Sequence, residues 1–295
     1  MEEVEEQEKL LFNACSWIHQ SQVVFIGAGA GISADSGLDL FRTPKDFWNF
    51  YPQLKPWNYY VPEMSNYNLF TKNPSLCWGY YAHRYTMYSS TEPHSGFNYL
   101  REICLLKNNN FFIYTTNIDG HFFKAGFDEN KIYEPNGNIG FLQYLNKKDG
   151  DDVWPFDHLN IPKYELSTLL ACEPYPVGLN MMPARPNIVL YEENNFSLKR
   201  VSQQKNKFEE YIDLVKQDDK ITILEIGASG SLNGHTKPVR LITEQLVKTF
   251  KNRVKIVRIN LDEYEVPNGH FGISMNAQEA LKEIYYTLIR YQMNN

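Results

Sequence analysis

The feature that most constrains this chain is a run of glycine and alanine at residues 27–31, directly after the apolar segment 23–26. A short apolar run of this kind is typical of a strand buried on both faces of a parallel sheet. Glycines after such a strand permit a tight turn, and they let the pyrophosphate of a dinucleotide approach the start of the next helix. By itself the run predicts either a dinucleotide-binding loop or a strand–helix connection that has no ligand.

The rest of the chain alternates between predicted strands and predicted helices. This alternation predicts an α/β fold with a Rossmann-like, doubly wound parallel sheet. Residues 43–75, rich in Pro, Asn, Trp and Tyr, predict a loop region with short helices. Apolar runs predict strands at 23–26, 111–116, 131–133, 187–191, 221–226 and 254–259, and helical spacing predicts helices at 5–20, 75–88, 95–107, 203–216, 236–249 and 276–291.

A second region interrupts this alternation. Residues 145–183 contain many Asp, Pro and Gly residues and a series of small turns. We therefore expect residues 145–183 to form a small inserted module. The Rossmann-like domain would then consist of residues 1–144 and 184–295.

Charge and composition exclude several classes of protein. The 295 residues carry a formal net charge of -6, which argues against a protein that neutralises nucleic-acid phosphates. No stretch approaches the length of apolar sequence that a membrane-spanning helix needs, so we expect no membrane contact. The acidic start is unlike a signal peptide, and the four cysteines form no CxxC pair. We expect reduced, mostly buried thiols and an intracellular location, without separating cytoplasm from nucleus.

Several segments, in the same order along the chain, resemble the sirtuin family. Residues 29–42 (GAGISADSGLDLFR) resemble the sirtuin signature GAGIS-x-x-(S/A)-GIPDFR, and residues 115–119 (TTNID) resemble TQNID. Residues 225–229 (EIGAS) resemble the GTS-type ribose and phosphate loop. Further similarity lies at 74–84, 93–97, 184–189 and 259–260. The resemblance implies the sirtuin fold and the use of NAD.

Sirtuins cleave NAD at the nicotinamide–ribose bond and pass ADP-ribose to an acyl-lysine or to another acceptor. The resemblance therefore implies an acyl-lysine or other protein acceptor as a second partner. It implies cofactor contacts by Gly29, Ala30, Gly31, Ser33, Phe41, Arg42, Thr116, Asn117, Asp119, Gly227, Ser229 and Asn260. It implies catalytic positions at Asn117, Asp119 and Asn136.

The residue types at two of these positions suit the chemistry. The amide of Asn117 would hold a water or a ribose hydroxyl near the anomeric carbon. The carboxylate of Asp119 would accept the carboxamide N–H of nicotinamide and favour a cationic transition state. Without the other motifs, local structure would be the preferred interpretation: Asn117 as a turn residue at a strand end and Asp119 as a helix cap.

The position of the family's general base differs here. Sirtuin deacylases carry a histidine in an HG dipeptide, whereas residues 134–140 (EPNGNIG) place Asn136 there. An amide cannot take up a proton near neutral pH. General-base catalysis contributes roughly 10²–10⁴-fold, so we expect conventional deacetylation to be weak or absent. Four other residues could in principle replace the missing general base, although no sequence feature supports any of them: His121, His94, Asp35 and Asp39.

Two other signature positions differ, and so does the zinc module. Thr116 replaces the Gln of TQNID, and the usual Asp before Phe41 is missing. The family holds a structural zinc with two pairs of cysteines, but Tyr144 stands at the first expected position, and Cys172 is the single cysteine where the second pair should fall. A tetrahedral zinc site needs four ligands, so we expect no zinc. We expect the module to rely on an aromatic core of Trp154, Phe156 and Tyr175.

Three functions follow from this uneven pattern. The first is an NAD hydrolase or ADP-ribosyltransferase, favoured by Asn117 and Asp119. The second, given about equal weight, is a catalytically inactive pseudoenzyme that serves as a structural component of an assembly or senses NAD or ADP-ribose. The third is an NAD-dependent protein deacylase that tolerates Asn136, which the general-base argument disfavours.

Overall fold

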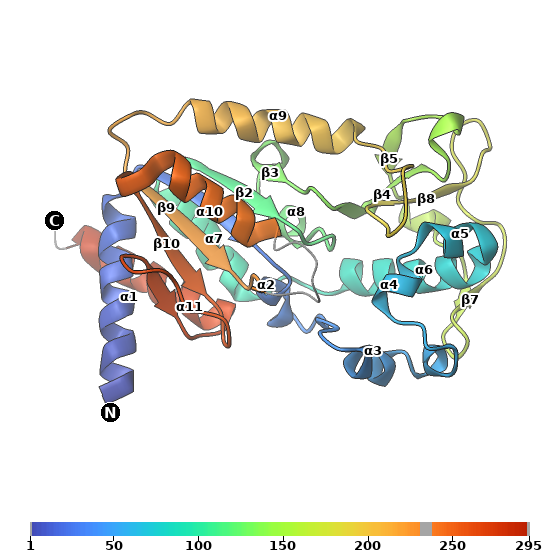
Figure 1. Ribbon diagram of the computed structural model, residues 1–295, viewed down its shortest axis with the longest axis horizontal. Helices are drawn as coiled ribbons and strands as arrows, with labels where there is room; N and C mark the ends of the chain where they lie inside the picture. The colour runs from blue at the N-terminus through green and yellow to red at the C-terminus, as the bar shows by residue number, and fades with distance from the viewer. Residues whose placement is uncertain (1, 231–237, 294–295) are drawn as a thin grey trace.

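The computed structural model describes residues 2–230 and 238–293. Its main sheet is parallel throughout and has the strand order β11-β10-β9-β1-β2-β3 (Figure 1). The predicted α/β, Rossmann-like fold is thereby confirmed. The strands of this sheet are β1 (Val23–Ala28), β2 (Phe111–Thr115), β3 (Ile132–Tyr133), β9 (Ile221–Ile226), β10 (Val254–Ile259) and β11 (Phe271–Ile273).

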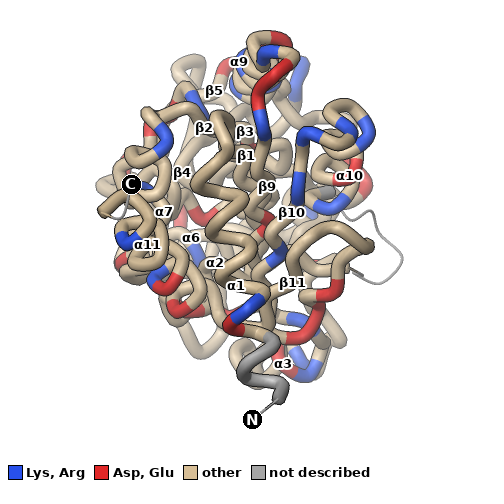
Figure 2. Tube along the Cα trace, turned by 90° about the vertical axis from the view of Figure 1, so that its left-hand side faces the viewer, with Lys and Arg blue, Asp and Glu red and all other residues tan. Residues whose placement is uncertain are grey.

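Helices cover both faces of the main sheet. One face packs against α1 (Glu2–Gln20), α7 (Ser95–Leu106) and α11 (Ala277–Met293), and the other against α9 (Lys199–Asp213) and α10 (Pro238–Phe250). Figure 2 shows α7 and α11 on one side of the strands and α10 on the other. Successive side chains of a strand point to opposite faces, so Val24 and Ile26 join the first core, whereas Phe25 joins the second.

A second lobe, on the right of Figure 1, has its own small sheet and its own core. Its antiparallel sheet has the order β5-β4-β8, formed by β5 (Val153–Pro155), β4 (Gly137–Tyr144) and β8 (Ala184–Ile188). Beside it lie a two-stranded pair, β6 (Tyr164–Glu165) and β7 (Leu170–Ala171), and the helices α3 (Pro44–Phe50), α4 (Val61–Met64), α5 (Tyr67–Lys72) and α6 (Pro74–Ser90). Short helices elsewhere are α2 (Gly31–Ala34) and α8 (His121–Lys124), with 3-10 turns at Pro52–Trp57, Glu129–Lys131, Lys147–Asp149, His158–Asn160 and Lys251–Arg253.

The core of this lobe draws on two separate parts of the sequence. Buried residues between positions 38 and 88 pack with buried residues between positions 139 and 190. Phe156 is buried in this cluster, and Trp154 and Tyr175 pack against it, as predicted. Residues 145–183 leave from β4 and return to β8, which pairs with β4. The division of the chain at residues 144 and 184 stays a prediction.

The predicted elements and the observed ones differ in a few places. The strand expected at 187–191 is β8, which begins three residues earlier and contains Pro186. Proline is tolerated there because β8 lies at the edge of its sheet. The sequence did not predict β4 or β11, and the first two residues of the helix expected at 236–249 lie outside the described residues.

Two expectations, one about the cysteines and one about membrane-spanning helices, can be compared with the described residues. Cys15, Cys77 and Cys104 are buried and free, whereas Cys172 is free and exposed. Within the described ranges, none of the helices has the length and apolar character that a membrane crossing requires. The intracellular location stays a prediction.

Candidate functional site

The predicted site residues gather at one edge of the main sheet. Because β1, β2, β9 and β10 are parallel neighbours, their carboxyl ends share an edge, and the loop after each strand begins there (Figure 1). These loops hold residues 29–33, 116–119, 227–230 and 260–263. Loops at the carboxyl ends of parallel strands are where ligands bind in folds of this class.

Glycines bring the first and third of these loops into direct contact. A Cβ atom on Gly29 would lie 2.6 Å from the Gly227 carbonyl oxygen, and one on Gly31 would lie 2.6 Å from the Gly227 Cα. The Gly31 N–H donates to the Gly227 oxygen at 3.0 Å. Gly227 itself has φ +58, in the left-handed region that favours glycine. Packing between the loops therefore requires these glycines even without a ligand, while Ala30 between them is exposed.

A hydrogen-bond network joins the loop after β1 to the loop after β2. The Asn117 side-chain amide donates to the Gly29 oxygen at 3.1 Å and lies 3.4 Å from the Ser33 hydroxyl. The Ser33 hydroxyl donates to Asp119 Oδ2 at 2.7 Å. Asn117 and Ser33 are both buried. The polar side chains of the two signature segments therefore form one connected unit at this edge.

Asp119 has two roles in this geometry. Its Oδ1 accepts the backbone N–H of His121 at 2.9 Å, at the start of α8. This contact agrees with the interpretation of Asp119 as a helix cap. Its Oδ2 accepts the Ser33 hydroxyl from the loop after β1, which holds the carboxylate at the edge where the site residues gather. The two interpretations are therefore compatible.

Asn136 lies beside Thr116, the residue that follows β2. Its side-chain amide nitrogen donates to the backbone oxygen of Thr116 at 3.0 Å, and its backbone oxygen accepts the Val189 N–H at 3.0 Å. Gly137 follows with φ +79, and a Cβ there would lie 2.0 Å from the Asn187 oxygen. This loop is therefore fixed against β8, and it carries an amide at the position of the family's base.

The two histidines considered as replacement bases lie in the protein interior. His94 accepts the Gly96 N–H on Nδ1 at 3.0 Å, and its Nε2 lies 2.7 Å from the Ile32 oxygen. His121 is fully buried. Burial lowers the pKa of both side chains, which favours their neutral forms.

The two acidic residues considered as replacement bases, Asp35 and Asp39, lie in different surroundings. Asp35 Oδ2 accepts the Gln278 N–H at 2.8 Å, which ties it to the start of α11. Asp39 is exposed. Neither geometry singles out a base for a ribose hydroxyl.

Phe41 and Arg42 lie on the segment that follows α2. Phe41 has φ +45, and its ring contacts the rings of Phe47, Phe50 and Tyr51. Arg42 Nη1 lies 2.8 Å from Asp262 Oδ2, and both side chains are more than half exposed. Arg42 thus links this segment to the loop after β10, although an exposed ion pair stabilises such a link only weakly.

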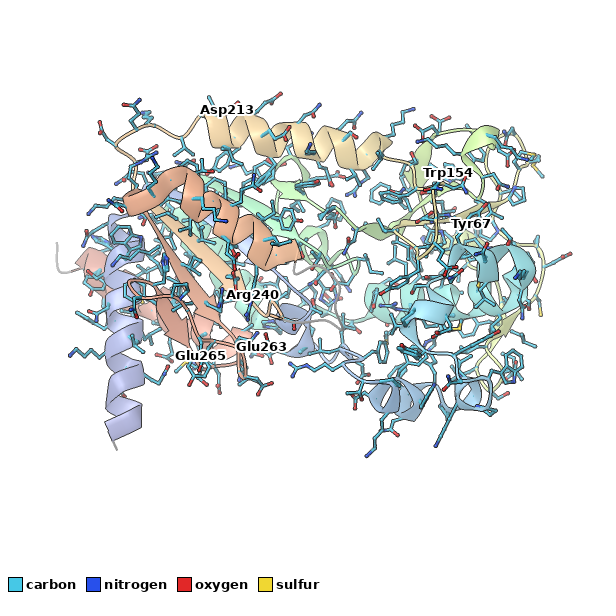
Figure 3. All side chains as sticks on the ribbon, viewed as in Figure 1. Tyr67, Trp154, Asp213, Arg240, Glu263 and Glu265 are labelled. Atoms are coloured by element: carbon cyan, nitrogen blue, oxygen red, sulfur yellow. The ribbon has the colours of Figure 1, made fainter. Side chains whose placement is uncertain are left out.

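The loops after β9 and β10 are held together by polar side chains. Asn260 Nδ2 donates to the Ala228 oxygen at 3.1 Å, and the Ser229 hydroxyl donates to Glu263 Oε1 at 3.1 Å. Glu263 also accepts the Gly230 N–H and lies 3.3 Å from Arg240 (Figure 3). Ser229 and Asn260 were expected here from the sequence, whereas Asp262, Glu263 and Arg240 were not. Arg240 reaches this edge only because the fold places α10 beside these loops.

The residues at this edge suit a dinucleotide. Amide and carboxylate groups are present for hydroxyl and carboxamide partners, and Arg42 provides a cation for a pyrophosphate. The exposed Ala30 lies directly before α2, at the end of the glycine loop.

The residues in the second lobe do not suit a zinc ion. Across residues 2–230 and 238–293, no three His, Cys, Asp or Glu side chains are grouped as metal ligands. The Tyr144 ring instead lies between two glycines, since added Cβ atoms on Gly150 and Gly178 would approach it to 2.4 and 2.0 Å. The Trp154 ring centroid is 5.0 Å from that of Tyr144. The expected absence of zinc from the protein stays a prediction.

Comparison with known families decides the classification. Residues 29–230, which include the glycine loop, Asn117, Asp119 and Asn136, match the Sir2 family. The chain belongs to the Sir2 family. The resemblance to sirtuins inferred from the sequence is therefore confirmed.

Two relatives with different stated activities cover different parts of this Sir2-family chain. An NAD-dependent protein deacylase of Deinococcus radiodurans is 30% identical over 176 residues, which are 58% of this chain and 62% of the relative. A probable bifunctional ADP-ribose hydrolase/ADP-ribosyltransferase of Fusarium oxysporum f. sp. cubense is 27% identical over 259 residues, 84% of this chain and 42% of the relative. The chain thus spans less than two thirds of the length of either relative.

Solved structures of Sir2 homologues share the fold. A mutant Sir2 homologue in complex with ADP-ribose has a TM-score of 0.65 at 19% identity, covering 95% of this chain and 97% of its own. A complex of a Sir2 homologue with NAD has a TM-score of 0.63 at 19% identity, covering 96% and 94%. At this level of identity the likeness concerns the fold.

Proposed function

We propose that this Sir2-family chain binds NAD at the carboxyl edge of its main sheet and cleaves the nicotinamide–ribose bond, as an NAD hydrolase or an ADP-ribosyltransferase. Conventional protein deacetylation is weak or absent in this proposal. The observation that carries it is the intact network of Ser33, Asn117 and Asp119 beside Asn136, which cannot act as a base. The polar groups for breaking the bond are retained, whereas the proton acceptor for acyl transfer is replaced.

Binding would rest on the loops that meet at this edge. The loop after β1 would receive the pyrophosphate at the start of α2, where backbone N–H groups favour an anion, with Arg42 as a cation nearby. Ser229 and Asn260 would hold the adenosine half. Phe41 and Thr116 would border the nicotinamide side.

Bond cleavage would rest on Asn117 and Asp119. As the bond between the anomeric carbon and the nicotinamide nitrogen breaks, its electron pair leaves with nicotinamide and positive charge develops on the ribose. The Asp119 carboxylate, oriented by Ser33, would stabilise that charge and accept the carboxamide N–H. Asn117 would position the water or the acceptor group that forms the new bond to carbon and gives up its proton to solvent.

Loss of the histidine has unequal consequences for the two reactions. A strongly cationic centre is attacked by water without a strong base, so hydrolysis is less sensitive to the loss. Acyl transfer uses the base on a ribose hydroxyl, and it loses the corresponding acceleration. The stated activity of the Fusarium relative, which aligns with 84% of this chain, supports the same choice.

A catalytically inactive NAD- or ADP-ribose-binding protein is the second candidate. Two observations favour it: the Asn136 side-chain amide is used in a structural hydrogen bond, and Thr116 replaces the family's Gln. In that case the chain would act through a protein partner. Such an assembly partner stays a prediction, as does a protein acceptor.

The test is nicotinamide release from NAD by the purified chain, with and without an acetylated peptide. The proposal expects release that needs no peptide and that falls at least 100-fold in Asn117→Ala, while Asn49→Ala, at an exposed position on α3, leaves it unchanged. Release that requires the peptide would instead indicate a deacylase. No release, together with protection by NAD against thermal unfolding, would indicate the inactive binding protein.

A further inference from the structure

A cavity of about 520 Å³ lies at the amino-terminal edge of the main sheet, the edge opposite the candidate site. Three connections form its walls: residues 19–23 between α1 and β1, residues 106–110 between α7 and β2, and residues 211–219 between α9 and β9. Its volume is in the range of small-molecule sites. Figure 3 labels Asp213, the last residue of α9, at the end of the helix where this wall begins.

The cavity is separate from the candidate NAD site. β1 and β9 each have six residues, so their two ends lie roughly 20 Å apart. A small molecule at the amino-terminal edge would therefore not overlap a dinucleotide at the carboxyl edge. The family motifs of the sequence contribute no residue to the cavity lining.

The lining combines an apolar wall with cationic groups. Val23, Leu106, Leu214 and Val215 supply apolar surface. Lys107, Lys216 and His19 supply the basic groups, and Asp219 is the single carboxylate among the described lining residues. This combination matches a molecule with an apolar body and a negative charge.

Lys107 is a partly buried cation of the cavity lining whose ammonium has no acidic partner among the described residues. Its Nζ donates to the His19 carbonyl oxygen at 2.9 Å. Among the described residues it takes part in no ion pair, although its side chain is partly buried. Burial lowers the pKa of Lys107, because desolvation disfavours the charged ammonium.

The carboxylate of the cavity is held by a local hydrogen bond. Asp219 Oδ2 accepts the backbone N–H of Lys216 at 2.9 Å, and the backbone oxygen of Asp219 accepts a hydrogen bond from the Arg253 guanidinium at 3.2 Å. The Asp219 carboxylate is therefore bonded within its own connection, and among the described residues it forms no ion pair with Lys107.

Hydrogen bonds fix the cavity walls in place. The Tyr211 hydroxyl donates to Asn110 Oδ1 at 2.9 Å, and Asn110 Nδ2 donates to the Gln22 oxygen at 2.8 Å. One side chain thus ties all three connections together. A site with fixed walls loses less free energy in ordering on binding than a mobile one does.

We propose that this cavity is a binding site for a small organic carboxylate, whose charge pairs with Lys107 and Lys216 and whose aliphatic body packs on Leu106, Leu214 and Val215. The site is independent of the NAD site and of the proposed NAD cleavage. Hexanoate is the probe for it, and hexanamide is the uncharged probe of matched size.

Calorimetry with the full chain tests the proposal. We expect hexanoate to bind wild type, hexanamide to bind at least tenfold more weakly, and Lys107→Gln and Lys216→Gln each to weaken hexanoate roughly tenfold. Lys248→Gln, at an exposed position on α10, is the matched control and should bind as wild type does. No binding by wild type, equal binding of the two probes, or unchanged binding in Lys107→Gln would overturn the proposal.

Chemical labelling gives a second test that needs no variant. An amine-acylating reagent at pH 8 should label Lys107 in the free protein, and saturating hexanoate should slow that labelling at least fivefold while labelling of Lys248 stays constant. ADP-ribose should leave the labelling of Lys107 unchanged. Labelling of Lys107 that hexanoate does not slow, or protection by hexanoate that ADP-ribose abolishes, would contradict a separate carboxylate site.

Discussion

At the residue scale, the proposed function depends on Asn136, which stands where the resemblance to sirtuins places the general base. The Asn136 loop is fixed by Gly137 and by hydrogen bonds to Thr116 and Val189, so the backbone that would present a base is well ordered. What is missing is a group that titrates near neutral pH, not the geometry around it. A single substitution should therefore change the balance between hydrolysis and acyl transfer.

We predict that Asn136→His raises peptide-dependent deacetylation at least tenfold above wild type. The physical reason is that imidazole accepts a proton near neutral pH, and such catalysis contributes roughly 10²–10⁴-fold. The measurement is the rate of lysine formation from an acetylated peptide in the presence of NAD. Asn136→Gln, which restores no base, is the control, and a gain of equal size in both variants would contradict the argument.

At the element scale, the sequence predicted elements with strong hydrophobic patterns and missed those defined by packing. The strands around Phe25 and Ile223 follow from continuous apolar runs, and both are central in the sheet. β4, with Gly137, Asn138 and Gly140, has no such pattern and becomes a strand only by pairing with β5 and β8. The order of the motifs indicated the candidate site through Asn117 and Asp119. The contacts of Ser229 and Arg240 with Glu263 could not be predicted, because they form only when the loop after β10 lies beside the loop after β9 and α10.

The second lobe offers a prediction at the same scale. Tyr144→Ala should lower the free energy of unfolding by about 3–5 kcal/mol, because it removes a buried ring packed between Gly150 and Gly178. Denaturant unfolding measures the change, and limited proteolysis should show faster cleavage within residues 145–183. Tyr144→Phe keeps the ring and should stay close to wild type.

A metal chelator tests whether a metal ion stabilises the second lobe. If the aromatic packing of Tyr144 and Trp154 is what holds it, EDTA should not change the unfolding curve of the wild-type protein. A chelator that lowered wild-type stability as much as Tyr144→Ala does would show that a metal contributes.

At the scale of the whole molecule, several histidines are stabilised in their neutral form. Burial is the largest cause that lowers the pKa of His83, His94, His121 and His270. These residues belong to different parts of the chain, and each is lowered relative to an ordinary value of 6.5. Their effects on stability therefore have the same sign.

We predict that the protein loses stability as pH falls from 7.5 to 5.5. A lowered folded-state pKa means that the unfolded chain takes up protons first, so stability is complete above about pH 6.5 and declines as pH falls below that value. The melting temperature should drop by a few degrees across this interval. His121→Phe should reduce the drop because it removes a fully buried titrating ring and keeps an aromatic contact with Phe97. His158→Gln, at an exposed 3-10 turn, should leave the drop unchanged, and a pH-independent melting temperature would contradict the argument.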